Sequence, residues 1–127
     1  MSQPVAAVLH DLAFNGGGTY ESGSYLPFRP SDGYSVAFEG GVKVPSRVVT
    51  IGFLTTWLKA VATEFESSFV GTWLDDAGDD AGGTVYIDAV RYIRSRDEAI
   101  AFGIAQHQIA IWDFAAGEAI TLPKEAE

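Results

Sequence analysis

The fold is decided by residues 50–93, which read TIGFLTTWLKAVATEFESSFVGTWLDDAGDDAGGTVYIDAVRYI. In the first third of this stretch, apolar side chains recur at steps of one, three and four, at Phe53, Leu54, Trp57, Leu58, Val61 and Phe65. This spacing puts them on one face of a helix, which we expect over residues 50–66. Residues 69–74 and 84–93 are rich in β-branched and aromatic side chains and flank a turn. They are therefore predicted to form a β-hairpin.

Two further strands are expected upstream of that helix. Residues 34–38, YSVAF, alternate apolar with polar or small side chains, which is typical of a half-buried strand. Residues 39–41 supply a turn, and residues 42–44 are predicted to return as a second strand. Residues 5–12 suit either a short helix or a strand, and the glycines at 16–18 predict a turn after them.

Downstream of the hairpin, a second helix and two strands are expected. Ser95 and Glu98 have the spacing of a capping box, in which each side chain satisfies a backbone N–H at the start of a helix. We place that helix over residues 96–106. Residues 108–114 are predicted to form a buried strand and residues 119–122 an edge strand.

This order of elements predicts an α+β fold. We expect a two-layer sandwich in which two helices pack on a mostly antiparallel sheet, and a ferredoxin-like βαββαβ topology is one way to connect it. A chain of 127 residues suits a single domain over 1–127. Within it we distinguish a loop-rich N-terminal extension (1–33), an α+β core (34–122) and a frayed tail (123–127).

Composition narrows the class of protein. The chain has 17 acidic and 8 basic residues, a net charge of −9 and no cysteine. Disulfide frameworks and Cys-based zinc sites are thereby excluded, and direct binding to nucleic acid is disfavoured because phosphates repel such a surface. No signal peptide or membrane-spanning stretch is recognisable, so we expect a location in the cytoplasm of a host cell.

The most acidic segment is the predicted hairpin turn, which contains Asp75, Asp76, Asp79 and Asp80. A calcium-binding EF-hand register that begins at Asp76 fails, because Ala81 falls where the loop needs glycine and Ile87 where it needs glutamate. A solvated turn is the favoured interpretation, with contact to a protein partner and metal binding as the alternatives. No metal or other cofactor is predicted.

Other candidate chemistry is weak. There is no Gly-x-Ser-x-Gly elbow, and the glycines at 16–18 lack the lysine of a phosphate-binding loop. His107 is expected to cap or hydrogen-bond near the end of the second predicted helix rather than to catalyse. Trp57, Trp73 and Trp112 are interpreted as core residues, with a ligand groove as the alternative. No catalytic residue is therefore assigned.

Five short motifs carry a resemblance. They are GGGTY at 16–20, GYSV at 33–36, GTWLD at 71–75, VYIDA at 85–89 and QIAIWD at 108–113. In this order they resemble small uncharacterised proteins of actinobacterial phages, prophages and plasmids. The resemblance implies an origin on a mobile element and brings no catalytic residues with it.

The favoured functional hypothesis is a non-enzymatic acidic interaction protein of a phage or mobile element. It would bind a host or defence protein with a basic surface through Asp75, Asp76, Asp79 and Asp80. The alternatives are a minor structural or assembly protein of a virion, or a homo-oligomer, and a small enzyme that uses Asp or Glu chemistry.

Overall fold

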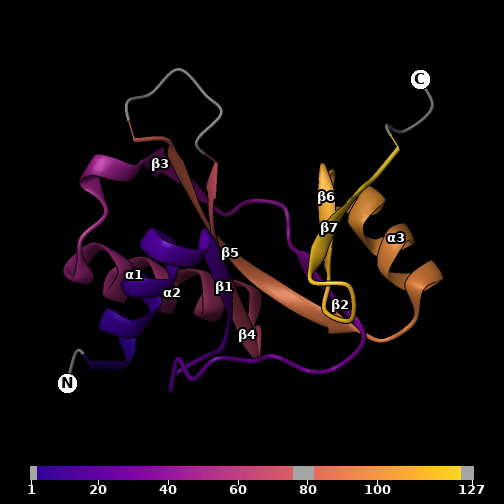
Figure 1. Ribbon diagram of the computed structural model, residues 1–127, viewed down its shortest axis with the longest axis horizontal. Helices are drawn as coiled ribbons and strands as arrows, with labels where there is room; N and C mark the ends of the chain where they lie inside the picture. Colours follow the sequence, from indigo (N-terminus) through magenta and orange to yellow (C-terminus); the bar gives the residue numbers. More distant parts are fainter. Residues whose placement is uncertain (1–2, 76–81, 124–127) are drawn as a thin grey trace.

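The computed structural model describes residues 3–75 and 82–123 (Figure 1). In chain order its elements are α1 (Gln3–Asn15), β1 (Gly17–Glu21), β2 (Tyr34–Ala37), β3 (Val42–Pro45), a 3₁₀ turn (Ser46–Val48), α2 (Ile51–Phe65), β4 (Phe69–Asp75), β5 (Thr84–Ile93), α3 (Arg96–Ala105), β6 (Ala110–Asp113) and β7 (Glu118–Thr121). The strands form one sheet in the order β1-β4-β5-β2-β6-β7, and β3 also pairs with β5. Every pairing is antiparallel, so the predicted α+β class and the antiparallel sheet are confirmed.

The N-terminal segment contributes more structure than the sequence analysis expected. Residues 3–15 form a helix because Val5, Val8 and Leu12 recur on one face, and all three are buried. The described part therefore has three helices where two were predicted, and β1 joins the sheet beside β4. The ferredoxin-like βαββαβ topology is not confirmed, because the described sheet has seven strands. None of the described helices is long and apolar enough to cross a membrane.

The two predicted helices begin where their capping residues indicate. The Thr50 Oγ1 accepts a hydrogen bond from the Phe53 N–H at 3.1 Å, and the Ser95 Oγ accepts one from the Glu98 N–H at 3.3 Å. Each cap satisfies a backbone donor that has no partner within its own helix. The β4–β5 hairpin is also confirmed, with Asp75 opposite Thr84 at its end.

One face of the sheet carries the hydrophobic core. Alternate residues of β5 point to it, and Val85, Ile87 and Ala89 pack beneath α1 and α2. Ile93, on the same face of β5, packs with α3 in a second cluster. Figure 1 shows β5 as the long strand that joins these two halves of the sheet. All three helices therefore cover the same face.

Phe38 links the two clusters. Its ring stacks on Phe65 of α2 with centroids 5.3 Å apart and meets Phe102 of α3 edge-on at 5.4 Å. Offset-stacked and edge-to-face geometries are the favourable arrangements for such rings. The helices over the two halves of the sheet are thereby joined into one layer.

The opposite face of the sheet is strongly concave. The Thr19 Oγ1 on β1 lies 3.5 Å from the Ser35 Oγ on β2, although β4 and β5 lie between these strands. Three strand spacings in a flat sheet would separate them by about 14 Å. The sheet therefore curls until residues on β1 and β2 meet across its inner face.

Phe28 fills one end of this concave face. It follows β1 and stacks on Phe69 with ring centroids 4.2 Å apart, and it meets Tyr92 and Phe114 edge-on at 5.1 and 5.8 Å. These partners come from β4, β5 and the end of β6. The remainder of the inner face is left uncovered by Phe28.

Candidate functional site

A cavity of about 950 Å³ occupies the open part of the concave face. Its lining comes from all seven strands, the end of α1, the segment 28–30 after β1, the loop after β2 and the loop between α3 and β6. On β5 the lining residues are Tyr86, Asp88 and Val90, which alternate with the core residues of the same strand. The pleat of the sheet thus gives one face to the core and the other to the cavity.

Aromatic side chains form much of the cavity wall. Trp73 on β4 stacks on its cross-strand neighbour Tyr86, with ring centroids 5.1 Å apart. Trp112 lines the same cavity from β6. Trp73 is 51% exposed and Trp112 is 42% exposed, so both rings meet solvent.

The interpretation of the three tryptophans as core residues was therefore wrong. Trp57 on α2 is also 40% exposed, and it lies outside the cavity lining. The alternation of side chains along a strand indicates that the strand has two faces, but it does not indicate which face the helices cover. Of the three tryptophans, Trp73 and Trp112 line the cavity, and the ligand-groove alternative stays a prediction for these two.

Asp88 lies in the cavity lining from the middle of β5 and is only partly exposed. Its partner across the sheet is Gly71 on β4, which has no side chain to contact the carboxyl. No hydrogen bond or ion pair joins Asp88 to any residue in the described ranges. Burial without a compensating partner raises the pKa of Asp88 to about 7.

Two basic residues line the same cavity nearer to solvent. The Lys43 Nζ lies 5.5 Å from the centroid of the Tyr86 ring, which is a cation–π distance. The Arg29 side chain is 70% exposed and forms an ion pair with Asp11 at 3.3 Å. Neither base forms an ion pair with Asp88 in the described structure.

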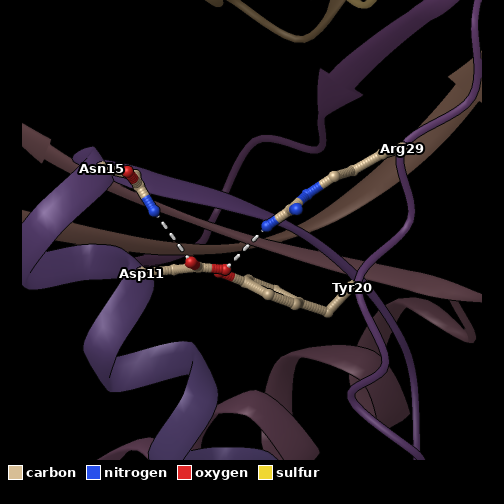
Figure 2. Close-up of polar contacts among 4 residues, drawn as sticks. All are labelled: Asp11, Asn15, Tyr20 and Arg29. Carbon is tan, nitrogen blue, oxygen red and sulfur yellow. Dashed lines mark hydrogen bonds and ion pairs between the residues drawn. The ribbon is translucent and has the colours of Figure 1, made fainter.

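Asp11 is the centre of a polar cluster at the rim (Figure 2). Its Oδ1 accepts a hydrogen bond from the Asn15 Nδ2 at 3.0 Å, and its Oδ2 accepts from the Tyr20 hydroxyl at 2.9 Å and from Arg29. Burial and the hydrogen bond to Asp11 raise the pKa of Tyr20 well above its ordinary range, so its hydroxyl remains a donor. The cluster joins α1, β1 and the segment that holds Phe28.

A second polar cluster forms the opposite rim. The Glu39 backbone N–H donates to the Gln106 Oε1 at 2.8 Å, and the Glu39 Oε1 lies 3.0 Å from the His107 Nδ1. His107 has a left-handed backbone, with φ of 56°, at the end of α3. The expectation that it would hydrogen-bond at this helix end is confirmed. These contacts hold the loop after β2 against the loop before β6.

The acidic residues predicted to contact a partner do not line the cavity as far as the structure describes them. Asp75 is the last residue of β4 and is partly exposed. Asp76, Asp79 and Asp80 lie outside the described residues. In the described ranges, no group of three or more His, Asp or Glu side chains is placed to hold a metal ion.

Comparison with known protein families, with curated proteins and with solved structures finds no match to this chain. The resemblance to proteins of phages and plasmids therefore stays a prediction. The functional proposal for this chain therefore rests on the chemistry of its own residues.

Asp88 is the site residue that the sequence analysis missed. Aspartate is depleted in strands, yet Asp88 interrupts a ten-residue run of strand-forming side chains, and that anomaly is the signal that could have found it. The glycine opposite it, Gly71, is visible only once the strand register is known.

Proposed function

We propose that the protein binds a small organic molecule in the cavity on the concave face of its sheet. The observation that carries this proposal is the combination of exposed aromatic rings with a partly buried carboxyl that has no partner among the described residues. A group of that kind costs folding free energy and is expected where it serves recognition.

The size and chemistry of the cavity fit this function. Sites for small molecules range from about 300 to 1,000 Å³ and are mostly apolar, with a few polar groups that orient the ligand. This cavity has about 950 Å³, and Trp73, Tyr86 and Trp112 provide flat apolar surface for a ring or chain. Asp88 provides the orienting polar group.

The cavity walls are supported by contacts that do not depend on a ligand. The Asp11 cluster fixes one rim, and the contacts of Glu39 with Gln106 and His107 fix the other. Phe28 closes one end through its three ring contacts. A preformed site loses less entropy when it binds, which favours affinity for a small ligand.

The test uses the three tryptophans as reporters. We would titrate the full chain with three probes that share a phenyl ring, namely 2-phenylethanol, 2-phenylethylammonium and 3-phenylpropanoate, and follow the indole N–H resonances by NMR. Trp→Phe variants assign each resonance. At least one probe is expected to shift the Trp73 and Trp112 signals in a saturable way and to leave Trp57 unchanged, because Trp57 lies outside the cavity.

Gly71→Val is the variant that blocks the site. Its side chain would occupy the space beside Asp88, and a Cβ at this position meets the Val90 Cγ1 at 3.2 Å without a strained backbone angle. Gly52→Ala is the matched control, because a Cβ there lies in open space on α2. If no probe shifts Trp73 or Trp112, or if all three tryptophans respond equally, the proposal is wrong.

The hypothesis that Asp75, Asp76, Asp79 and Asp80 bind a basic protein stays a separate prediction. Replacing all four with Asn would test it, since a salt-sensitive partner captured by the native chain should then be lost. The cavity is expected to keep its probe binding in that variant, because Asp75, the one of the four that the structure describes, is not among its lining residues.

A further inference from the structure

The charge of the ligand follows from the depth at which charged groups lie in the cavity. This inference rests on the proposed function. Among the residues that the structure describes, the charged or titratable side chains that line the cavity with Asp88 are Asp11, Tyr20, Arg29, Glu39, Lys43, Tyr86 and His107. Among these, Arg29 is held by Asp11, Glu39 pairs with His107, and Lys43 is exposed. Asp88 is the carboxyl without a described partner.

We propose that the cavity binds an organic cation, whose ammonium group lies between the Asp88 carboxylate and the exposed ring of Trp73. An ammonium group beside a carboxylate replaces the solvation that Asp88 lost on folding. Aromatic faces attract the same group through their quadrupoles, most strongly where water is excluded. The apolar part of the ligand packs toward Trp112.

The register of the sheet provides a place for that group. Asp88 and Tyr86 are two residues apart on one face of β5, while Gly71 and Trp73 occupy the facing positions of β4. The nearest atoms to a Cβ built on the bare Gly71 are the Val90 Cγ1 at 3.2 Å and the Gly18 carbonyl oxygen at 3.5 Å, so the missing side chain leaves a narrow gap in the wall opposite Asp88. An ammonium group is small enough to enter a gap left by one missing side chain.

Lys43 shows that this aromatic wall accepts a cation. Its ammonium group lies over the Tyr86 ring, 5.5 Å from the ring centroid. The net charge of −9 adds a long-range potential that attracts cations and repels anions. Both observations favour a cationic ligand over an anionic one.

The experiment compares the same three probes by their dissociation constants. The 2-phenylethylammonium ion is expected to bind at least tenfold more tightly than 2-phenylethanol, and 3-phenylpropanoate most weakly. In Asp88→Asn, the ratio between the cation and the alcohol should fall to near one. In Lys43→Met, the cation should bind several-fold more tightly, because a competing positive charge has been removed.

The pH dependence supplies an independent readout. Cation affinity should rise from about pH 6 to about pH 8 as Asp88 loses its proton, and Asp88→Asn should abolish this rise. His10→Gln is the matched control, since this histidine lies outside the cavity lining. The rise should persist in that variant.

The outcomes separate this inference from the proposed function. Tighter binding of the alcohol or of 3-phenylpropanoate at Trp73 and Trp112 would overturn the cationic ligand and leave the binding cavity in place. Weaker cation binding in Lys43→Met would also overturn it. A titration in which no probe shifts these two tryptophans would overturn both.

Discussion

The Asp88 Oδ1 lies so close to the Cα of Gly41 that no side chain fits at position 41. A Cβ built on Gly41 would overlap that oxygen and would lie 2.6 Å from the carbonyl oxygen of Ile87. Gly41 stands between β2 and β3, where the chain turns along the edge of β5. The glycine therefore makes room for the carboxyl in the cavity.

Gly41→Ala is expected to destabilise the fold by about 1–3 kcal/mol, because the methyl group displaces Asp88 or moves β3 away from β5. Urea unfolding measures the change. Gly52→Ala, on open helix surface, should instead stabilise by about 0.5–1 kcal/mol. Adding Asp88→Ala to Gly41→Ala should recover part of the loss, and strictly additive effects of the two substitutions would contradict the contact.

Asp88→Asn should stabilise the protein only above acidic pH. The pKa of Asp88 rises from 3.8 to about 7 on folding, so the native chain loses stability as pH rises from about 4 to about 7. Below that window the carboxyl is protonated in both states and its amide replacement is nearly neutral. Above it, the variant should be more stable by at most about 4 kcal/mol.

Urea unfolding of both proteins across this pH range measures the difference. A stability gain that is the same at every pH would show that the pKa of Asp88 does not change when the chain folds. Glu64→Gln, on the exposed side of α2, is the matched control for the removal of one carboxylate.

Tyr20→Phe should destabilise the protein by about 1–3 kcal/mol. The hydroxyl donates to the Asp11 carboxylate from a side chain that is 1% exposed, and its removal leaves the Asp11 Oδ2 with Arg29 alone as a side-chain donor. Thermal or urea unfolding measures the loss. Tyr34→Phe is the matched control, because no hydrogen bond from the Tyr34 hydroxyl is found within the described residues. Equal effects of the two substitutions would argue against the rim cluster in Figure 2.

Gly103→Ala should destabilise the protein although alanine is the better helix former. A Cβ on Gly103 would lie 2.6 Å from the Leu122 Cδ1 and 3.0 Å from the Ile111 Cγ2, so the Leu122 side chain would have to change its position and the packing of α3 on β6 would have to loosen slightly. We expect a loss of about 1–3 kcal/mol by urea unfolding. A stability gain like that of Gly52→Ala would show that α3 packs less closely than described.

Sequence patterns predicted the elements that depend on local signals. The apolar stripe of α2, the cap at Ser95 and the β4–β5 hairpin all follow from spacing and residue type. Helix α1 was left open because its stripe of Val5, Val8 and Leu12 is short and glycines follow it. Local pattern is a weak guide when a helix depends on tertiary packing.

The cavity could not be predicted because it depends on curvature and register. Nothing local in Thr19 or Ser35 indicates that they meet across two intervening strands. The apposition of Asp88 and Gly71 likewise follows from pairing between β4 and β5 and not from sequence distance. The rings of Trp73 and Trp112 were assigned to the core, since strand alternation is the same on both faces of a sheet.

Because the described helices cover only one face of the sheet, alternate residues of β5 are subject to different constraints. Val85, Ile87 and Ala89 pack against the helices on one face. Tyr86, Asp88 and Val90 line the cavity on the other face. Under the proposed function, mutations of the cavity-lining residues of β5 should change ligand selectivity and leave the core-facing residues of the strand in place. Such a strand is a natural starting point for directed evolution of new selectivity, with every second codon randomised and the others held fixed.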